Sequence, residues 1–113
     1  MSKVLIDTNL FLDDSNIIFK LAREYDEILL PLVVLRELDA HKMNSSSSFS
    51  ARKAIQSIME FRESEPNRII FDVESHKNLS EGATNDDKII HSAQVHEANI
   101  ATKDTSMAMQ AEA

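Results

Sequence analysis

The chain has 113 residues, 42% hydrophobic and 27% charged, proportions that are ordinary for one domain with a single core. It has no cysteine and one glycine, which excludes disulfides, thiolate metal sites and glycine-rich phosphate-binding loops. No apolar run approaches membrane-spanning length and the N-terminus lacks a signal-peptide pattern, so we expect a cytoplasmic protein without a membrane partner. The net charge of −7 indicates either simple solubility or clustered acids that require a divalent cation.

Short apolar runs predict strands, and amphipathic stretches between them predict helices. The runs at 3–9, 27–31, 68–73 and 99–102 are continuous rather than alternating, which is typical of a parallel sheet covered on both faces. Helical spacing of apolar residues predicts helices over 17–25, 31–38, 51–63 and 85–93, and a last helix with apolar positions Met107, Ala108 and Ala111. The expected caps are Ser15, then Thr84 or Asn85, then Thr105, and loops are expected at 11–15, 44–48 and 74–84.

Four acids fall at or near the carboxyl edge of this predicted sheet, where open α/β folds bind their ligands. Asp7 and Asp104 each follow a strand, Glu37 lies about two turns into the second predicted helix, and Asp86 occupies the first turn of a later helix. Each acid also has a plainer explanation. Asp7 fits a turn, Glu37 fits a boundary position, and Asp86 and Asp87 suit the positive end of a helix dipole.

If these four carboxylates converge, they repel one another unless a cation intervenes. Mg²⁺ and Mn²⁺ prefer carboxylate and water oxygens, and such metals activate a water for phosphodiester cleavage. Arg52 and Lys53, at the start of the third amphipathic helix, are candidates to hold the phosphates of a substrate. They fit a solvated helix face equally well.

Motifs along essentially the whole chain resemble those of PIN-domain ribonucleases, and most closely the PIN domain that precedes a PhoH-type ATPase. In chain order the motifs are Ile6-Asp7-Thr8-Asn9, Leu30-Pro31-Leu32-Val33-Val34-Leu35-Arg36-Glu37-Leu38-Asp39, Ala51-Arg52-Lys53-Ala54, Asn85-Asp86-Asp87-Lys88-Ile89-Ile90 and Ala101-Thr102-Lys103-Asp104.

The resemblance implies a Rossmann-like three-layer α/β/α sandwich with a parallel sheet of about four strands. It implies endonucleolytic cleavage of single-stranded RNA by a water that Mg²⁺ or Mn²⁺ activates. It assigns the catalytic metal ligands, which are Asp7, Glu37, Asp86 and Asp104. It also assigns the side chains that orient these ligands or the attacking water, which are Thr8, Asn9, Asp87 and Thr102.

The chain departs from the family pattern at its end, because the usual fifth strand is absent and no ATPase follows. We expect one truncated PIN-like domain over residues 1–113 whose open edge strand at 99–102 and exposed Met107 and Ala111 favour a homo-oligomer. The alternative is a catalytically weak or silent module that contacts RNA or serves a PhoH-type ATPase. A phosphoacceptor receiver fits less well, because Thr8 and Asn9 rather than a further acid follow Asp7.

Overall fold

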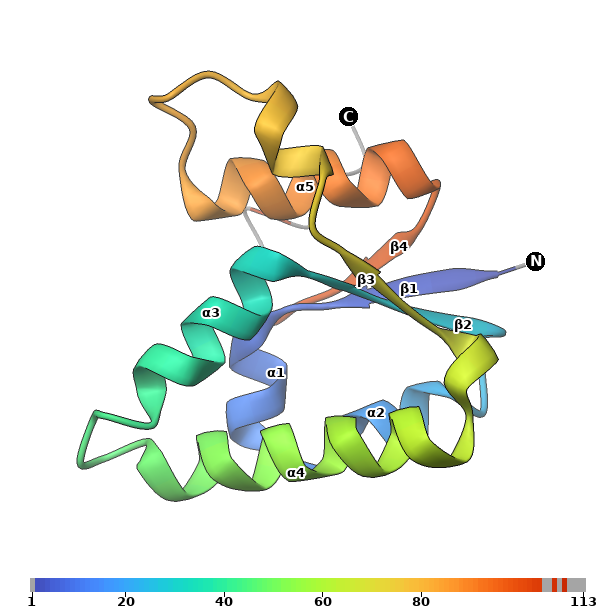
Figure 1. The fold of residues 1–113 in the computed structure, drawn as a ribbon, viewed down its shortest axis with the longest axis vertical. Coiled ribbons are helices and arrows are strands. Elements are labelled where there is room, and N and C mark those ends of the chain that lie inside the picture. Colours follow the sequence, from blue (N-terminus) through green and yellow to red (C-terminus); the bar gives the residue numbers. More distant parts are fainter. Residues whose placement is uncertain (1, 105–106, 108, 110–113) are drawn as a thin grey trace.

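Four parallel strands form one sheet in the order β3-β2-β1-β4 (Figure 1). The structure is a computed structural model that describes residues 2–104, 107 and 109. The strands are β1 (Lys3–Ile6), β2 (Glu27–Pro31), β3 (Ile69–Asp72) and β4 (Asn99–Ala101). The predicted parallel sheet is thus confirmed, with β3 and β4 at its edges.

Helices cover both faces of the sheet, as expected for an α/β/α sandwich. Figure 1 shows α5 on one side and α1, α2 and α4 on the other. Among the described residues no helix is long and apolar enough to cross a membrane. The helices and 3₁₀ turns are α1 (Thr8–Asp13), α2 (Ile17–Leu21), α3 (Leu32–His41), α4 (Ser48–Ser64), η1 (Pro66–Arg68), η2 (Ser75–Asn78) and α5 (Asn85–His96).

The core forms where the two central strands meet the helices on both faces. Leu5 pairs with Leu29 of β2 and with Ile100 of β4, and Leu5 and Leu29 are fully buried. Full burial of a side chain of this size stabilises the fold by about 1.5–3 kcal/mol, so these contacts hold the strand register. The buried apolar residues that the helices add to this cluster are Phe11, Ile18, Val33, Val34, Leu38, Ala54, Ile58, Phe61, Ile89 and Ala93.

The segment between β1 and β2 differs from the prediction. The sequence predicts a loop at 11–15, but residues 8–13 form α1, because the Asp7 carboxylate caps the helix by accepting from the Thr8 N–H at 2.8 Å. The predicted helix to Tyr25 is also too long, since α2 ends at Leu21. Asn16, and not the predicted Ser15, occupies its N-cap position, without a side-chain capping hydrogen bond.

The last predicted helix lies partly outside the described residues, including its expected cap Thr105 and the apolar positions Ala108 and Ala111. Within the described residues, Asp104 Oδ1 accepts from the Met107 N–H at 3.1 Å. The expected exposure of Met107 is wrong, because its side chain is 3% exposed and packs into the core cluster.

Asp72, at the end of β3, is a buried carboxylate that the sequence did not single out. Its Oδ1 accepts from the backbone N–H groups of Glu74 and Ser75, both at 3.0 Å. Its Oδ2 accepts from Ser92 Oγ at 2.6 Å and lies 3.2 Å from His96 Nε2. Burial by itself would raise the pKa of Asp72, but the hydrogen bonds from Ser75, Ser92 and Glu74 outweigh it and hold the pKa well below its ordinary value. Asp72 thus ties β3 and η2 to α5.

Asp72→Asn should lower the free energy of unfolding at pH 7 by about 1–3 kcal/mol, because a neutral amide replaces a buried, charged acceptor. The pKa is depressed in the folded state, so the stabilisation is fully present above the ordinary value of 3.8 and is lost as the pH falls below it. Urea unfolding of both proteins between pH 7 and about pH 2.5 measures the difference. A difference that stays constant across this range would contradict the explanation from charge.

Candidate active site

The carboxyl ends of β1 and β4 bring Asp7 beside Thr102. Ile6 pairs with Ala101, and the Asp7 N–H donates to the Ala101 carbonyl at 3.0 Å, so both chain segments leave the sheet at the same height. Asp7 Oδ2 accepts from Thr102 Oγ1 at 2.7 Å, while Oδ1 accepts from the Thr8 N–H. The residue is only 4% exposed. Its carboxylate is therefore held by donors from two chain segments that are far apart in sequence.

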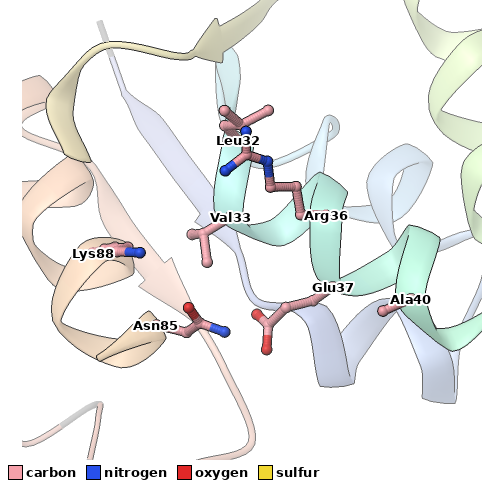
Figure 2. Close-up of a pocket in the computed structure, with 7 residues that line it drawn as sticks. All are labelled: Leu32, Val33, Arg36, Glu37, Ala40, Asn85 and Lys88. Carbon is pink, nitrogen blue, oxygen red and sulfur yellow. The ribbon is translucent and has the colours of Figure 1, made fainter. Parts of the chain in front are cut away.

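Glu37 reaches the same edge because β2 passes directly into α3. The last residue of β2, Pro31, stays extended at φ −73° and ψ 153°, and α3 begins at the next residue. Glu37 Oε1 accepts from Thr8 Oγ1 at 2.9 Å, and Thr8 directly follows Asp7. Figure 2 shows the Glu37 carboxylate directed from α3 toward Asn85 on α5. One threonine thus links two of the four predicted acids.

Asp86 and Asp104 approach this edge from the first turn of α5 and from the turn after β4. The pKa of Asp86 is raised first by burial and then by the negative charges of Asp104, Asp7 and Asp87. The Asp104 N–H donates to Thr102 Oγ1 at 3.0 Å, and the same hydroxyl donates to Asp7. The charges of Asp104 and Asp7 therefore reach Asp86, and the Thr102 hydroxyl joins Asp104 to Asp7.

The chemistry of this donor set fits a hard divalent cation. Mg²⁺ and Mn²⁺ prefer carboxylate oxygens, and a cation would relieve the repulsion that raises the pKa of Asp86. Over residues 2–104, 107 and 109, however, no three acidic or histidine side chains are arranged as a metal-binding group. The residues that would hold the ion are Asp7, Asp86 and Asp104, with Glu37 beside them.

The four predicted orienting residues fall into two groups in the structure: two donate a hydrogen bond to a predicted acid, and two have other surroundings. Thr8 and Thr102 each donate a hydroxyl hydrogen bond to a predicted acid, whereas Asn9 is exposed on α1. Asp87 forms a capping box with Thr84. Its Oδ2 accepts from the Thr84 N–H at 3.0 Å, and its own N–H donates to Thr84 Oγ1 at 3.1 Å. The contacts of Asp87 therefore secure the start of α5.

The predicted phosphate contacts, Arg52 and Lys53, lie on α4. Arg52 Nε donates to Ser48 Oγ at 3.3 Å, and the Lys53 ammonium lies 5.6 Å from the centre of the Phe49 ring. Neither Arg52 nor Lys53 lines either of the two surface hollows that open beside Glu37 and are described next. Their contact with RNA remains a prediction.

A hollow of about 260 Å³ does open beside Glu37, between α3 and the start of α5 (Figure 2). We call it the Arg36–Lys88 hollow, and its lining residues are Leu32, Val33, Arg36, Glu37, Ala40, Asn85 and Lys88. A second hollow of about 350 Å³, the His41–Asn44 hollow, has the lining residues Glu37, Ala40, His41, Asn44 and Asn85. Because three lining residues are common to both, the two hollows adjoin along α3 with Glu37 between them.

The sequence did not assign a role in the site to Arg36 or Lys88, and it named Asn85 only as a possible helix cap, although all three lie within the motifs that resemble the PIN family. Their positions within each helix give no sign that they share one cavity. That arrangement arises only when α3 and α5 pack on the folded sheet.

Comparison with known proteins finds one matching family and a solved structure with a similar fold. The model of the PIN domain matches residues 4–113. No curated protein matches the chain. Among solved structures, the chain is similar to "a domain of a functionally unknown protein from Methanocaldococcus jannaschii DSM 2661", with a TM-score of 0.70 and 20% sequence identity over 99% of this chain and 85% of that chain. At this identity the similarity shows a shared fold.

Asp86→Asn should raise the melting temperature of the metal-free protein, because it removes a charge that neighbouring carboxylates repel. A raised pKa means that the folded protein binds the proton more tightly than the unfolded chain, so stability falls as the pH rises from the ordinary value of 3.8 to the folded value. The gain should stay below about 1 kcal/mol, since Asp86 remains exposed at the surface and solvent screens its charge, although neighbouring atoms displace enough water to raise its pKa.

Asp87→Asn is the comparison variant, because it removes one of the neighbouring charges that repel Asp86. It also weakens the capping box, so its melting temperature should fall rather than rise. Thermal unfolding at pH 7 in EDTA and low salt measures both variants. A melting temperature of Asp86→Asn at or below that of the wild type would show that the neighbouring carboxylates do not destabilise the charged form of Asp86.

Proposed function

Because the chain belongs to the PIN domain family, whose members are generally nucleases, we propose that it is an endoribonuclease. Its substrate is single-stranded RNA, and its cofactor is Mg²⁺ or Mn²⁺. The observation that carries the proposal is the contact between the ends of β1 and β4, where Thr102 Oγ1 donates to Asp7 Oδ2 at 2.7 Å and accepts from the Asp104 N–H at 3.0 Å. Glu37 joins these acids through the Thr8 hydroxyl.

Asp7, Asp86 and Asp104 would hold the divalent cation, which would supply Lewis acidity to activate water and to neutralise charge on the phosphate. The chain itself supplies orientation. Thr102 fixes one oxygen of Asp7, so this carboxylate has a set direction before substrate arrives. Thr8 holds Oε1 of Glu37, which leaves Oε2 to accept a proton from the attacking water.

A module that contacts RNA without cleaving it is the second candidate. The observation that favours it is that both Asp7 oxygens already accept hydrogen bonds. Each Asp7 oxygen has only one further lone pair free for a metal, and the donor on that oxygen draws charge away from it, which weakens the carboxylate as a ligand. Cleavage of a labelled RNA separates the two candidates.

We further propose, on the sequence motifs alone, that a PhoH-type ATPase is the partner of this domain. The support is the order of the four acid-bearing motifs together with the Ala51-Arg52-Lys53-Ala54 start of α4. Adding such an ATPase as a separate chain should change the rate of RNA cleavage in an ATP-dependent way. An unchanged rate with and without ATP would count against this partner.

A labelled single-stranded oligoribonucleotide should be cut by the protein with Mn²⁺, leaving a 5′-phosphate and a 3′-hydroxyl. EDTA or Asp7→Asn should abolish cleavage, because each removes the cation or a ligand for it. Asp39→Asn is the control, since it removes the same charge from an exposed residue of α3 that pairs with Lys42. Cleavage that survives EDTA or Asp7→Asn would refute the proposal, and no cleavage by the wild type would favour the non-cleaving module.

Thr102→Val should lower the cleavage rate by roughly 10–100-fold, because residues that orient metal ligands typically contribute that much. The hydroxyl of Thr102 donates to Asp7, so removing it should also raise the Mn²⁺ concentration needed for half-maximal activity. Thr102→Ser keeps the hydroxyl and should restore most of both quantities. Equal impairment of the Val and Ser variants, at unchanged melting temperature, would show that the methyl group rather than the hydroxyl matters.

A further inference from the structure

The Arg36–Lys88 hollow carries two positive charges next to the acidic edge of a protein with a net charge of −7. Figure 2 shows the Lys88 ammonium directed from α5 into the hollow and the Arg36 guanidinium over Leu32. Within the described part of the chain, neither cation takes part in an ion pair. Glu37 also lines the hollow, but the two cations outnumber this one carboxylate and neither is paired with it, so the hollow favours an anion.

The hollow also has an apolar lining. Leu32, Val33 and Ala40 contribute it, and Figure 2 shows Val33 between the Lys88 ammonium and Glu37. The volume of about 260 Å³ falls just below the range of about 300–1,000 Å³ that is usual for drug-sized ligands. The space therefore suits a small group with one flat apolar face and one negative charge.

We propose that the Arg36–Lys88 hollow binds one nucleotide of the single-stranded RNA substrate, next to the bond that is cut. The base packs against Leu32 and Val33, and its phosphate lies between Arg36 and Lys88. This inference rests on the proposed ribonuclease function and adds the path of the substrate to it.

The adjoining His41–Asn44 hollow gives the strand a continuous path along α3. Glu37 and Asn85 line both hollows, so a strand that fills them crosses the Glu37 carboxylate between two nucleotides. The Asn85 amide carries both donors and an acceptor and can pair with a base edge. The path thus joins a basic nucleotide site to the acids that are proposed to cut the bond.

The test measures binding of a fluorescein-labelled eight-nucleotide oligouridylate by fluorescence anisotropy, in EDTA so that no cleavage occurs. The test variant is Arg36→Gln with Lys88→Gln, which removes both charges and keeps long polar side chains. The charge-matched control is Arg23→Gln with Arg62→Gln. Arg23 precedes β2 and Arg62 lies in the last turn of α4, near the amino ends of the strands and opposite to the acids.

The Arg36 and Lys88 double variant should bind the RNA at least about tenfold more weakly at low salt, and the control should change affinity less than about twofold. The slope of log K against log salt concentration should fall by about 0.7 for each phosphate that the variant no longer neutralises. Melting temperatures near that of the wild type establish that both variants fold. Equal weakening in both variants, no detectable binding by the wild type at low salt, or a larger decrease from Arg52→Gln with Lys53→Gln would overturn the site.

Failure of the nucleotide site and failure of the nuclease proposal give different results. If the wild type does not cut RNA but the Arg36 and Lys88 variant still binds more weakly than the control, the nucleotide site stands and the cleavage proposal falls. If Asp7→Asn abolishes cleavage but the Arg36 and Lys88 variant binds like the control, the nuclease stands and the nucleotide site falls.

Discussion

Parallel pairing of β1 with β4 is the constraint on which the candidate site depends. The pairing of Ile6 with Ala101 sets Asp7 and Thr102 at one height, although their side chains belong to residues 95 positions apart. A slip of one residue would turn the side chains of a strand to the opposite face, because their period is two. The full burial of Leu5 and Ile6 makes such a slip costly, so the hydrophobic core also fixes the hydrogen bond between Thr102 and Asp7.

Asp7 and Asp72 show how one sequence pattern leads to two kinds of carboxylate. Asp7 directly follows the apolar strand β1, Asp72 is the last residue of the apolar strand β3, and each is less than 10% exposed. Asp72 lies on the edge strand β3, where donors from η2 and α5 surround it and lower its pKa, so it serves as a structural link. Asp7 follows a central strand between β2 and β4, where its charge instead acts on Asp86. The neighbouring strands, and not the local sequence, separate the two roles.

The sequence predicts the sheet well, because continuous apolar runs such as residues 3–6 and 27–31 have few alternatives to burial in a parallel sheet. Helix α1 escaped prediction because six residues are too short to show a periodic stripe, and the Asp7 cap that starts it also fits a turn. The role of Asp72 depends on Ser92 and His96, which are remote in sequence. The shared cavity of α3 and α5 likewise follows from packing, which no local pattern encodes.

The net charge of −7 does not decide where an RNA strand binds, because salt screens exposed charges beyond about 8 Å under physiological conditions. A phosphate in the Arg36–Lys88 hollow would respond mainly to those two cations and to the nearby acids. After burial, the negative charges of Asp104, Asp7 and Asp87 help to raise the pKa of Asp86, and a nearby phosphate would add to this repulsion. A cation bound by the acids reduces the repulsion among the carboxylates and also the repulsion between the carboxylates and the phosphate. By thermodynamic linkage, each ligand must then strengthen the binding of the other by the same factor. An acid cluster beside a basic hollow therefore suits a protein that holds RNA more firmly when its cation is present.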